Sequence, residues 1–276
     1  MNYPYKENTF TFESQKIVYI DGGEGTPLIF LHGQASDLMN FEPVYSMFAR
    51  DFRIIALDYP GYGKSGKVGV VLTEDSLVRL LEQLYKVTQI QSATLIGHSF
   101  GGYVAMLFAL ANPGMVQSMI LVSPAGLQEY TPAVQQYLRS SFTVAEIVKT
   151  SVEKAYQNYR ASSVYWSPQM EKYAQYRIEL LKKGGDDYQE YARAMVQAME
   201  LMLNTKIRER IGSIHIPTLL VWGNQDPLIP LTVGKEAKRI IQNSRLKTID
   251  RCGHFPMLEY PNQFHRIIQT FLAVQI

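Results

Sequence analysis

The feature that most restricts the fold of this chain is a repeated alternation of short apolar runs with longer amphipathic stretches. The apolar runs are rich in β-branched residues and nearly continuous, which is typical of parallel strands covered on both faces. The predicted strands are KIVYI (16–20), PLIFL (27–31), FRIIAL (52–57), SATLI (92–96), SMILV (118–122), PTLLVW (217–222) and RLKTI (245–249). Helices are predicted between several of them, including one after the N-cap candidate Thr73 and one from Pro261. This pattern predicts an α/β fold with a doubly wound, mostly parallel sheet.

The alternation stops between residues 127 and 212. This segment has helical patterns and many tyrosines and methionines, and the strand pattern resumes only at residue 217. We therefore predict that residues 1–126 and 213–276 form the two parts of one core, and that residues 127–212 form an inserted helical cap. Most of the aromatic and methionine side chains would form the interior of the cap, and a minority would line a pocket.

Composition limits the classes of function that the chain can serve. Its 276 residues, 46% of them hydrophobic, are enough for one large domain with an insertion. The 27 Lys and Arg residues are scattered and are balanced by 25 Asp and Glu residues, which argues against a nucleic-acid or anionic membrane partner and favours a small-molecule substrate. No apolar run approaches the roughly 18 residues that a membrane span needs. The oligomeric state stays open, with a homodimer as one option.

The cysteine content and the first residues of the chain indicate the cellular compartment. The single cysteine, Cys252, cannot form an internal disulfide, and we expect it to pack near the end of a strand. The first residues, MNYPYKENTF, lack the apolar stretch of a secretory signal. Both features predict a cytoplasmic protein.

A candidate nucleophile lies where a predicted strand meets a predicted helix. Residues 97–101, Gly-His-Ser-Phe-Gly, match G-x-S-x-G, the signature of a sharp turn that exposes a serine hydroxyl. A serine hydroxyl is a poor nucleophile at neutral pH, so Ser99 requires a base, an acid that orients the base, and donors for an oxyanion.

The base and the acid are expected on loops that follow predicted strands, because such loops converge at the carboxyl edge of the sheet. His254 in CGHFPMLE follows the last strand, and it alone among the five histidines has the position expected of a base. Asp226 in VWGNQDPLIP follows the strand at 217–222, whereas the loop after residue 122 reads SPAG and contains no carboxylate. We predict a catalytic triad of Ser99, Asp226 and His254.

Backbone N–H groups are the expected oxyanion donors. One is Phe100, directly after the nucleophile, and the other is Gln34 in LHGQAS, on the loop after the strand at 27–31. Gly33 would let that loop turn tightly.

Cofactor and metal motifs are not supported. GYGKS (61–65) ends like a phosphate-binding loop, but Asp58 stands where that motif needs glycine, so no nucleotide cofactor is predicted. The chain has no H-E-x-x-H motif and no paired cysteines, so no metal is predicted. We expect Asp58 to brace a loop.

Together these motifs carry a family resemblance. The stretches LHGQAS (31–36), DYPGYGKS (58–65), GHSFGG (97–102), GNQDPLIP (223–230) and GHFPMLEYPNQF (253–264) follow one another in an order and spacing that resembles the α/β-hydrolase superfamily, in its capped, lipase- and esterase-like branch. The resemblance covers the chain outside the cap. Haloalkane dehalogenases and epoxide hydrolases of this fold place an aspartate at the nucleophile position, so Ser99 argues against those reactions.

The expected activity is that of a serine hydrolase of the carboxylesterase type, cleaving a small to medium apolar carboxylic ester through an acyl-enzyme on Ser99. Three enzymes of the same fold remain as alternatives: a C–C bond hydrolase acting on vinylogous diketones, a lactonase and an aminopeptidase. A weakly catalytic ligand-binding receptor is the alternative from a different class.

Overall fold

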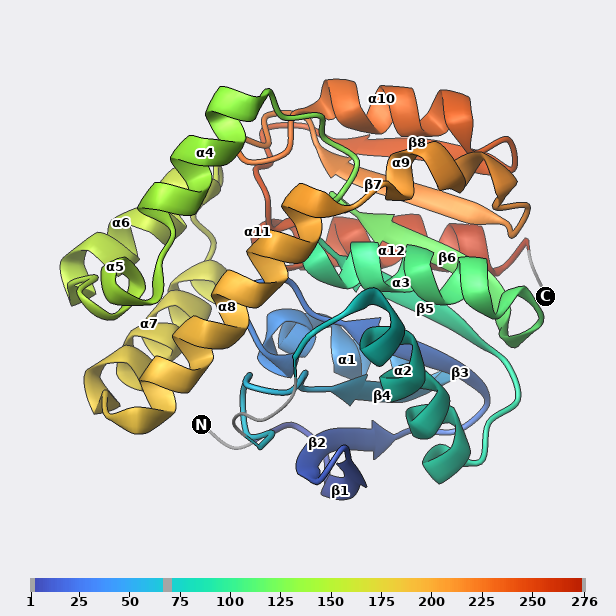
Figure 1. Cartoon of the computed structure of the whole chain (residues 1–276). Helices are drawn as coiled ribbons and strands as arrows, with labels where there is room; N and C mark the ends of the chain where they lie inside the picture. The colour runs from blue at the N-terminus through green and yellow to red at the C-terminus, as the bar shows by residue number, and fades with distance from the viewer. Residues whose placement is uncertain (1–2, 67–70, 275–276) are drawn as a thin grey trace.

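A central β-sheet organises the molecule, whose computed structural model describes residues 3–66 and 71–274. Within these residues the sheet has eight strands in the order β1-β2-β4-β3-β5-β6-β7-β8 (Figure 1). β2 pairs antiparallel with β1 and β4, and the remaining pairs are parallel. The doubly wound, mostly parallel sheet predicted from the sequence is therefore confirmed. The strands are β1 (Glu7–Phe12), β2 (Gln15–Gly22), β3 (Thr26–Leu31), β4 (Phe52–Leu57), β5 (Ala93–His98), β6 (Val116–Val122), β7 (Thr218–Gly223) and β8 (Ser244–Ile249).

The edge strand β1 was not predicted. It alternates exposed residues with Phe10 and Phe12, so it lacks the continuous apolar run that marks the inner strands. Its hairpin with β2 turns through Glu13 and Ser14 at positive φ, without the glycine or asparagine that signals such a turn in a sequence.

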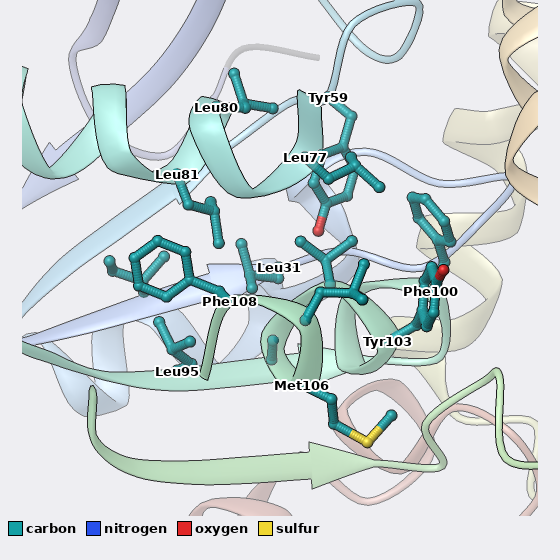
Figure 2. Packing of buried hydrophobic residues seen from close by; sticks show 14 of the residues in the cluster. Leu31, Tyr59, Leu77, Leu80, Leu81, Leu95, Phe100, Tyr103, Met106 and Phe108 are labelled. Carbon is teal, nitrogen blue, oxygen red and sulfur yellow. The ribbon is translucent and has the colours of Figure 1, made fainter. Parts of the chain in front are cut away.

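Helices cover both faces of the sheet, and successive strand residues point to opposite layers. Leu31 and Leu95 pack with α2 (Glu74–Thr88) and α3 (Phe100–Ala111), as Figure 2 shows. Their neighbours Phe30 and Ile96 pack with α1 (Glu42–Phe48) and α12 (Pro261–Leu272) on the other face. Burial on both sides explains why the inner strands read as unbroken apolar runs.

The helix boundaries follow local signals. Thr73 caps α2 in a reciprocal capping box with Ser76, and Pro261 begins α12, as the sequence predicted. The shorter elements are η1 (Leu38–Phe41), η2 (Pro113–Met115), α9 (Ile207–Arg210), η3 (Ile211–Ser213), α10 (Leu231–Ile240) and α11 (Pro256–Glu259).

A group of helices is inserted between β6 and β7, and Figure 1 shows them together at one end of the strands. They are α4 (Pro132–Ser141), α5 (Val144–Val148), α6 (Val152–Ser162), α7 (Pro168–Lys183) and α8 (Asp186–Asn204). α7 and α8 bury several side chains, whereas α4 and α6 bury none. No helix in the described ranges is both long and apolar enough to cross a bilayer.

Candidate active site

Ser99 lies in a tight turn between β5 and α3. Its backbone has φ 51° and ψ −115°, a conformation that L-residues rarely adopt and that often marks functional sites. A Cβ at Gly97 would lie 2.4 Å from the carbonyl oxygen of Gly101, and one at Gly101 would lie 2.0 Å from that of Leu31. Both glycines of the motif are therefore required by close backbone contacts. Ser99 is half-buried, whereas Phe100 is completely buried.

Asp226 and His254, from the loops after β7 and β8, form a buried hydrogen-bonded pair. The Nδ1 of His254 lies 2.8 Å from Oδ2 of Asp226, and Nδ1 is the donor because an ionised carboxylate only accepts. Oδ1 of Asp226 accepts the backbone N–H groups of Leu228 and Ile229, each at 2.9 Å. Burial raises the pKa of Asp226, but the imidazole of His254 and the N–H of Ile229 outweigh it and hold the pKa below its usual value. This arrangement leaves Nε2 of His254 free to accept a proton.

His98 connects the Ser99 turn with the His254 loop. Its Nε2 lies 2.8 Å from the backbone oxygen of His254, and the centroids of the two rings are 4.7 Å apart. Nε2 is the donor in this contact because a backbone oxygen only accepts, and burial lowers the pKa of His98 well below its usual value. No hydrogen bond joins the hydroxyl of Ser99 to His254. The structure thus brings the two loops together but does not show the contact between nucleophile and base.

The loop after β3 packs against the Ser99 turn. A Cβ at Gly33 would lie 3.3 Å from the Cβ of Ser99, which places the predicted donor Gln34 next to the turn. The Gln34 side chain donates from Nε2 to the backbone oxygen of Met195 in α8 at 2.7 Å. Phe100, the second predicted donor, is the first residue of α3, where helical N–H groups have no partner within the helix.

A polar cluster that the sequence analysis missed joins α7 to the same loop. The guanidinium of Arg177 donates from an Nη to Asp37 at 2.6 Å, and both side chains are buried. Tyr176 also donates to Asp37, and the hydroxyl of Tyr173 lies 2.6 Å from that of Ser36. In the sequence, Arg177 has the appearance of an ordinary polar residue on an amphipathic helix. Its burial follows only from the packing of α7 on the loop.

Arg177 of this cluster also lines a cavity of about 160 Å³. The Nε of Arg177 is buried without a hydrogen-bond partner, although both guanidinium Nη atoms are bonded. The residues around the cavity include Gly61, Tyr159, Arg177, Leu181, Tyr188 and Tyr191. The hydroxyl of Tyr159 donates to the backbone oxygen of Ala35 at 3.3 Å, so one wall of the cavity borders the loop that carries Gln34.

Asp58 and Cys252 are not part of the candidate site formed by Ser99, Asp226 and His254. Asp58 accepts the hydroxyl of Tyr3 and the backbone N–H groups of Leu38 and Lys64, so it braces two loops as predicted. Cys252 is buried, and burial raises the pKa of its thiol, which disfavours a reactive thiolate.

In the part of the chain that the structure describes, no cluster of three or more His, Cys, Asp or Glu residues could hold a metal ion.

Comparisons with known proteins identify the family. The family model described as alpha/beta hydrolase fold matches residues 26–261. A 2-hydroxy-6-oxononadienedioate/2-hydroxy-6-oxononatrienedioate hydrolase of Paraburkholderia xenovorans is 28% identical over 92% of this chain and 90% of its own length. A 2-hydroxy-6-oxo-6-phenylhexa-2,4-dienoate hydrolase of Comamonas testosteroni is 29% identical over 93% of this chain and 91% of its own length.

A solved structure extends the comparison to the fold. The thermophilic esterase from Thermogutta terrifontis superimposes with a TM-score of 0.83, with 20% sequence identity over 98% of this chain and 99% of that one. At this level of identity the likeness concerns the fold alone.

Proposed function

The chain belongs to the alpha/beta hydrolase fold family, and on this premise we propose that it is a serine hydrolase whose catalytic residues are Ser99, His254 and Asp226. The family and the names of the curated relatives support hydrolase activity. The observation that carries the assignment of residues is the buried Asp226–His254 pair beside the strained turn at Ser99.

The proposed reaction is acyl transfer to water. Ser99 Oγ attacks the substrate carbonyl while Nε2 of His254 takes its proton, and Asp226 stabilises the imidazolium that forms. The N–H groups of Gln34 and Phe100 stabilise the oxyanion. His254 then protonates the leaving group, and a water molecule, activated in the same way, releases the acid and regenerates Ser99. Contacts between nucleophile and base often tighten only when substrate binds, which accounts for the missing Ser99–His254 bond.

We propose a carboxylic ester with a small to medium apolar group as the substrate. Aromatic and aliphatic side chains of α6, α7 and α8 line the cavity near the Gln34 loop, including Tyr159, Leu181 and Tyr188. A cavity of about 160 Å³ favours a modest group over a long chain.

A C–C bond hydrolase is the second candidate, and one observation favours it. The curated relatives are named for dienoate or dienedioate substrates, which carry carboxylates. The buried Arg177, with an unpartnered Nε beside the cavity, is a cation suited to a carboxylate. On this alternative, Ser99 and His254 would act on the ketone of such an acid.

We also propose that residues 127–212 act as a cap that sets specificity, and that residues 1–126 and 213–276 form the core that carries the chemistry. Hydrogen bonds between the loop at 34–37 and the helices α7 and α8 support this division. Truncating Tyr188, which lines the cavity, should therefore change KM and the ranking of substrates. It should leave the turnover of a small activated ester nearly unchanged.

A substrate panel tests the proposal. Short p-nitrophenyl esters, lactones, aminoacyl amides and dienoic diketones are assayed side by side with the wild type and Ser99→Ala. Turnover of the esters that is lost in Ser99→Ala supports the ester hydrolase. Preferred turnover of a dienoic diketone, with KM raised in Arg177→Lys, supports the second candidate. Inactivity toward the whole panel, with tight binding of one compound, would replace both with a receptor.

A further inference from the structure

The carboxylate of Glu259, the last residue of α11, is a buried acceptor that the proposed reaction does not use. The side chain is 1% exposed. Its oxygens accept the backbone N–H of Gly253 at 3.0 and 2.9 Å and that of Phe255 at 3.1 Å. They also accept the N–H groups of Val164 and Tyr165, each at 2.9 Å. One carboxylate thus binds four backbone donors from two separate segments.

The two segments meet at His254. Gly253 and Phe255 flank it directly, and the N–H of His254 itself donates to the backbone oxygen of Ser162 at 2.9 Å. A Cβ at Gly253 would lie 2.7 Å from the same oxygen of Ser162, so the segments are in close contact. With the bond from His98 to the His254 oxygen, both the backbone N–H and the backbone C=O of the candidate base have hydrogen-bond partners.

Only an ionised carboxylate matches these donors. It presents two oxygens that accept and do not donate, and backbone N–H groups face both of them. A glutamine amide would keep one oxygen and turn its NH₂ group toward the donors on the other side. Those donors would then be buried without an acceptor.

We propose that Glu259 is a positioning residue for His254, and that it ties the position of this base to the segment between α6 and α7. The inference rests on the proposed role of His254. Val164 and Tyr165, in the segment between α6 and α7, donate to the same carboxylate as Gly253 and Phe255, in the loop that carries the base. A shift of that segment would therefore move His254 relative to Asp226 and Ser99.

Two conservative variants test the proposal, Glu259→Gln and Glu259→Asp. We expect kcat to fall about 10- to 100-fold with KM nearly unchanged, because a misplacement of about 1 Å in a catalytic group can cost 10²-fold. The pH profile of kcat/KM should also change. An NMR readout does not depend on activity: the downfield proton on Nδ1 of His254, identified by its absence in Asp226→Asn, should weaken or shift.

Leu84→Ala in α2 is the control for lost stability alone, since Leu84 packs in the opposite core layer. It should unfold at a lower temperature and keep the kcat, pH profile and proton signal of the wild type. If Glu259→Gln does not fold, Glu259→Asp, which keeps the charge and shortens the side chain, supplies the same comparison. Folded Glu259 variants that behave like Leu84→Ala would overturn the proposal. If the wild type shows the proton signal but no turnover, the proposed function fails, and the NMR comparison still decides the role of Glu259.

Discussion

Replacing Asp226 with asparagine should abolish most activity while leaving the fold intact. In the structure Oδ1 accepts the N–H groups of Leu228 and Ile229, and Oδ2 accepts from His254. An asparagine has one acceptor oxygen, and the two backbone donors would retain it. The NH₂ group must then face Nδ1 of His254, which can only accept in that arrangement. The proton moves to Nε2, where it prevents His254 from deprotonating Ser99.

The size of the effect follows from this change of tautomer. In serine proteases the equivalent replacement lowers kcat by about 10⁴-fold, which corresponds to about 5.5 kcal/mol of transition-state stabilisation. We expect a loss of that order in kcat with KM much less affected, because the missing interaction belongs to the transition state. The two backbone hydrogen bonds are retained, so the loop should remain folded.

Asp58→Asn is the matched control, because Asp58 is an equally buried carboxylate that accepts three donors. An asparagine there leaves at least one backbone donor unsatisfied, with an expected loss of about 1–3 kcal/mol in the free energy of unfolding. Both variants are assayed with p-nitrophenyl acetate and by thermal unfolding, and activity is expressed per folded molecule. Near-wild-type kcat in Asp226→Asn together with collapse in Asp58→Asn would refute the assignment and make Asp58 the candidate acid.

Three further predictions concern the nucleophile, the turn and the pH dependence of stability. A fluorophosphonate should add one label, found by mass spectrometry on Ser99 and unaffected by Cys252→Ala; a label elsewhere contradicts the assignment. Gly101→Ala should unfold at a markedly lower temperature in calorimetry, because the new Cβ would lie 2.0 Å from a backbone oxygen; unchanged stability would contradict the close packing. Burial lowers the pKa of His32 to about 4, so the folded state favours the neutral ring while the unfolded chain gains a proton below pH ~6.5. His32 should therefore contribute about 3 kcal/mol to the free energy of unfolding above pH 6.5, and this contribution should be lost between pH 6.5 and 4. Urea titrations should show a smaller loss over this range in His32→Gln than in the wild type.

The environment of His32 gives this last prediction a structural basis. Its Nδ1 lies 2.8 Å from the backbone oxygen of Gly33 and acts as the donor, while Nε2 accepts the N–H of Tyr59 at 3.3 Å. A neutral ring satisfies both contacts. A protonated ring would direct an N–H at the N–H of Tyr59.

Several elements could be predicted from local signals alone. The apolar runs of the inner strands reflect burial on both faces, and the caps of α2 and α12 lie in a few consecutive residues. The strand-to-helix turn at Ser99 could be predicted because its motif occupies five consecutive residues. The glycines of that motif are needed because a Cβ on either would collide with the backbone of the turn or of the neighbouring strand β3. β1 was missed because an edge strand with one buried face has a weak pattern and its turn lacks glycine.

The sequence by itself determined the succession of the seven strands from β2 to β8 along the chain. It also determined that Ser99, Asp226 and His254 follow strands, because the carboxyl ends of parallel strands lie at one edge of the sheet. The tertiary structure alone decided which polar side chains are buried there. The acceptor role of Glu259 depends on N–H groups nearly a hundred residues away, and Arg177 in α7 is buried against Asp37 in the loop after β3. Such partners leave no periodic pattern in the sequence, since a backbone N–H is the same in every residue but proline.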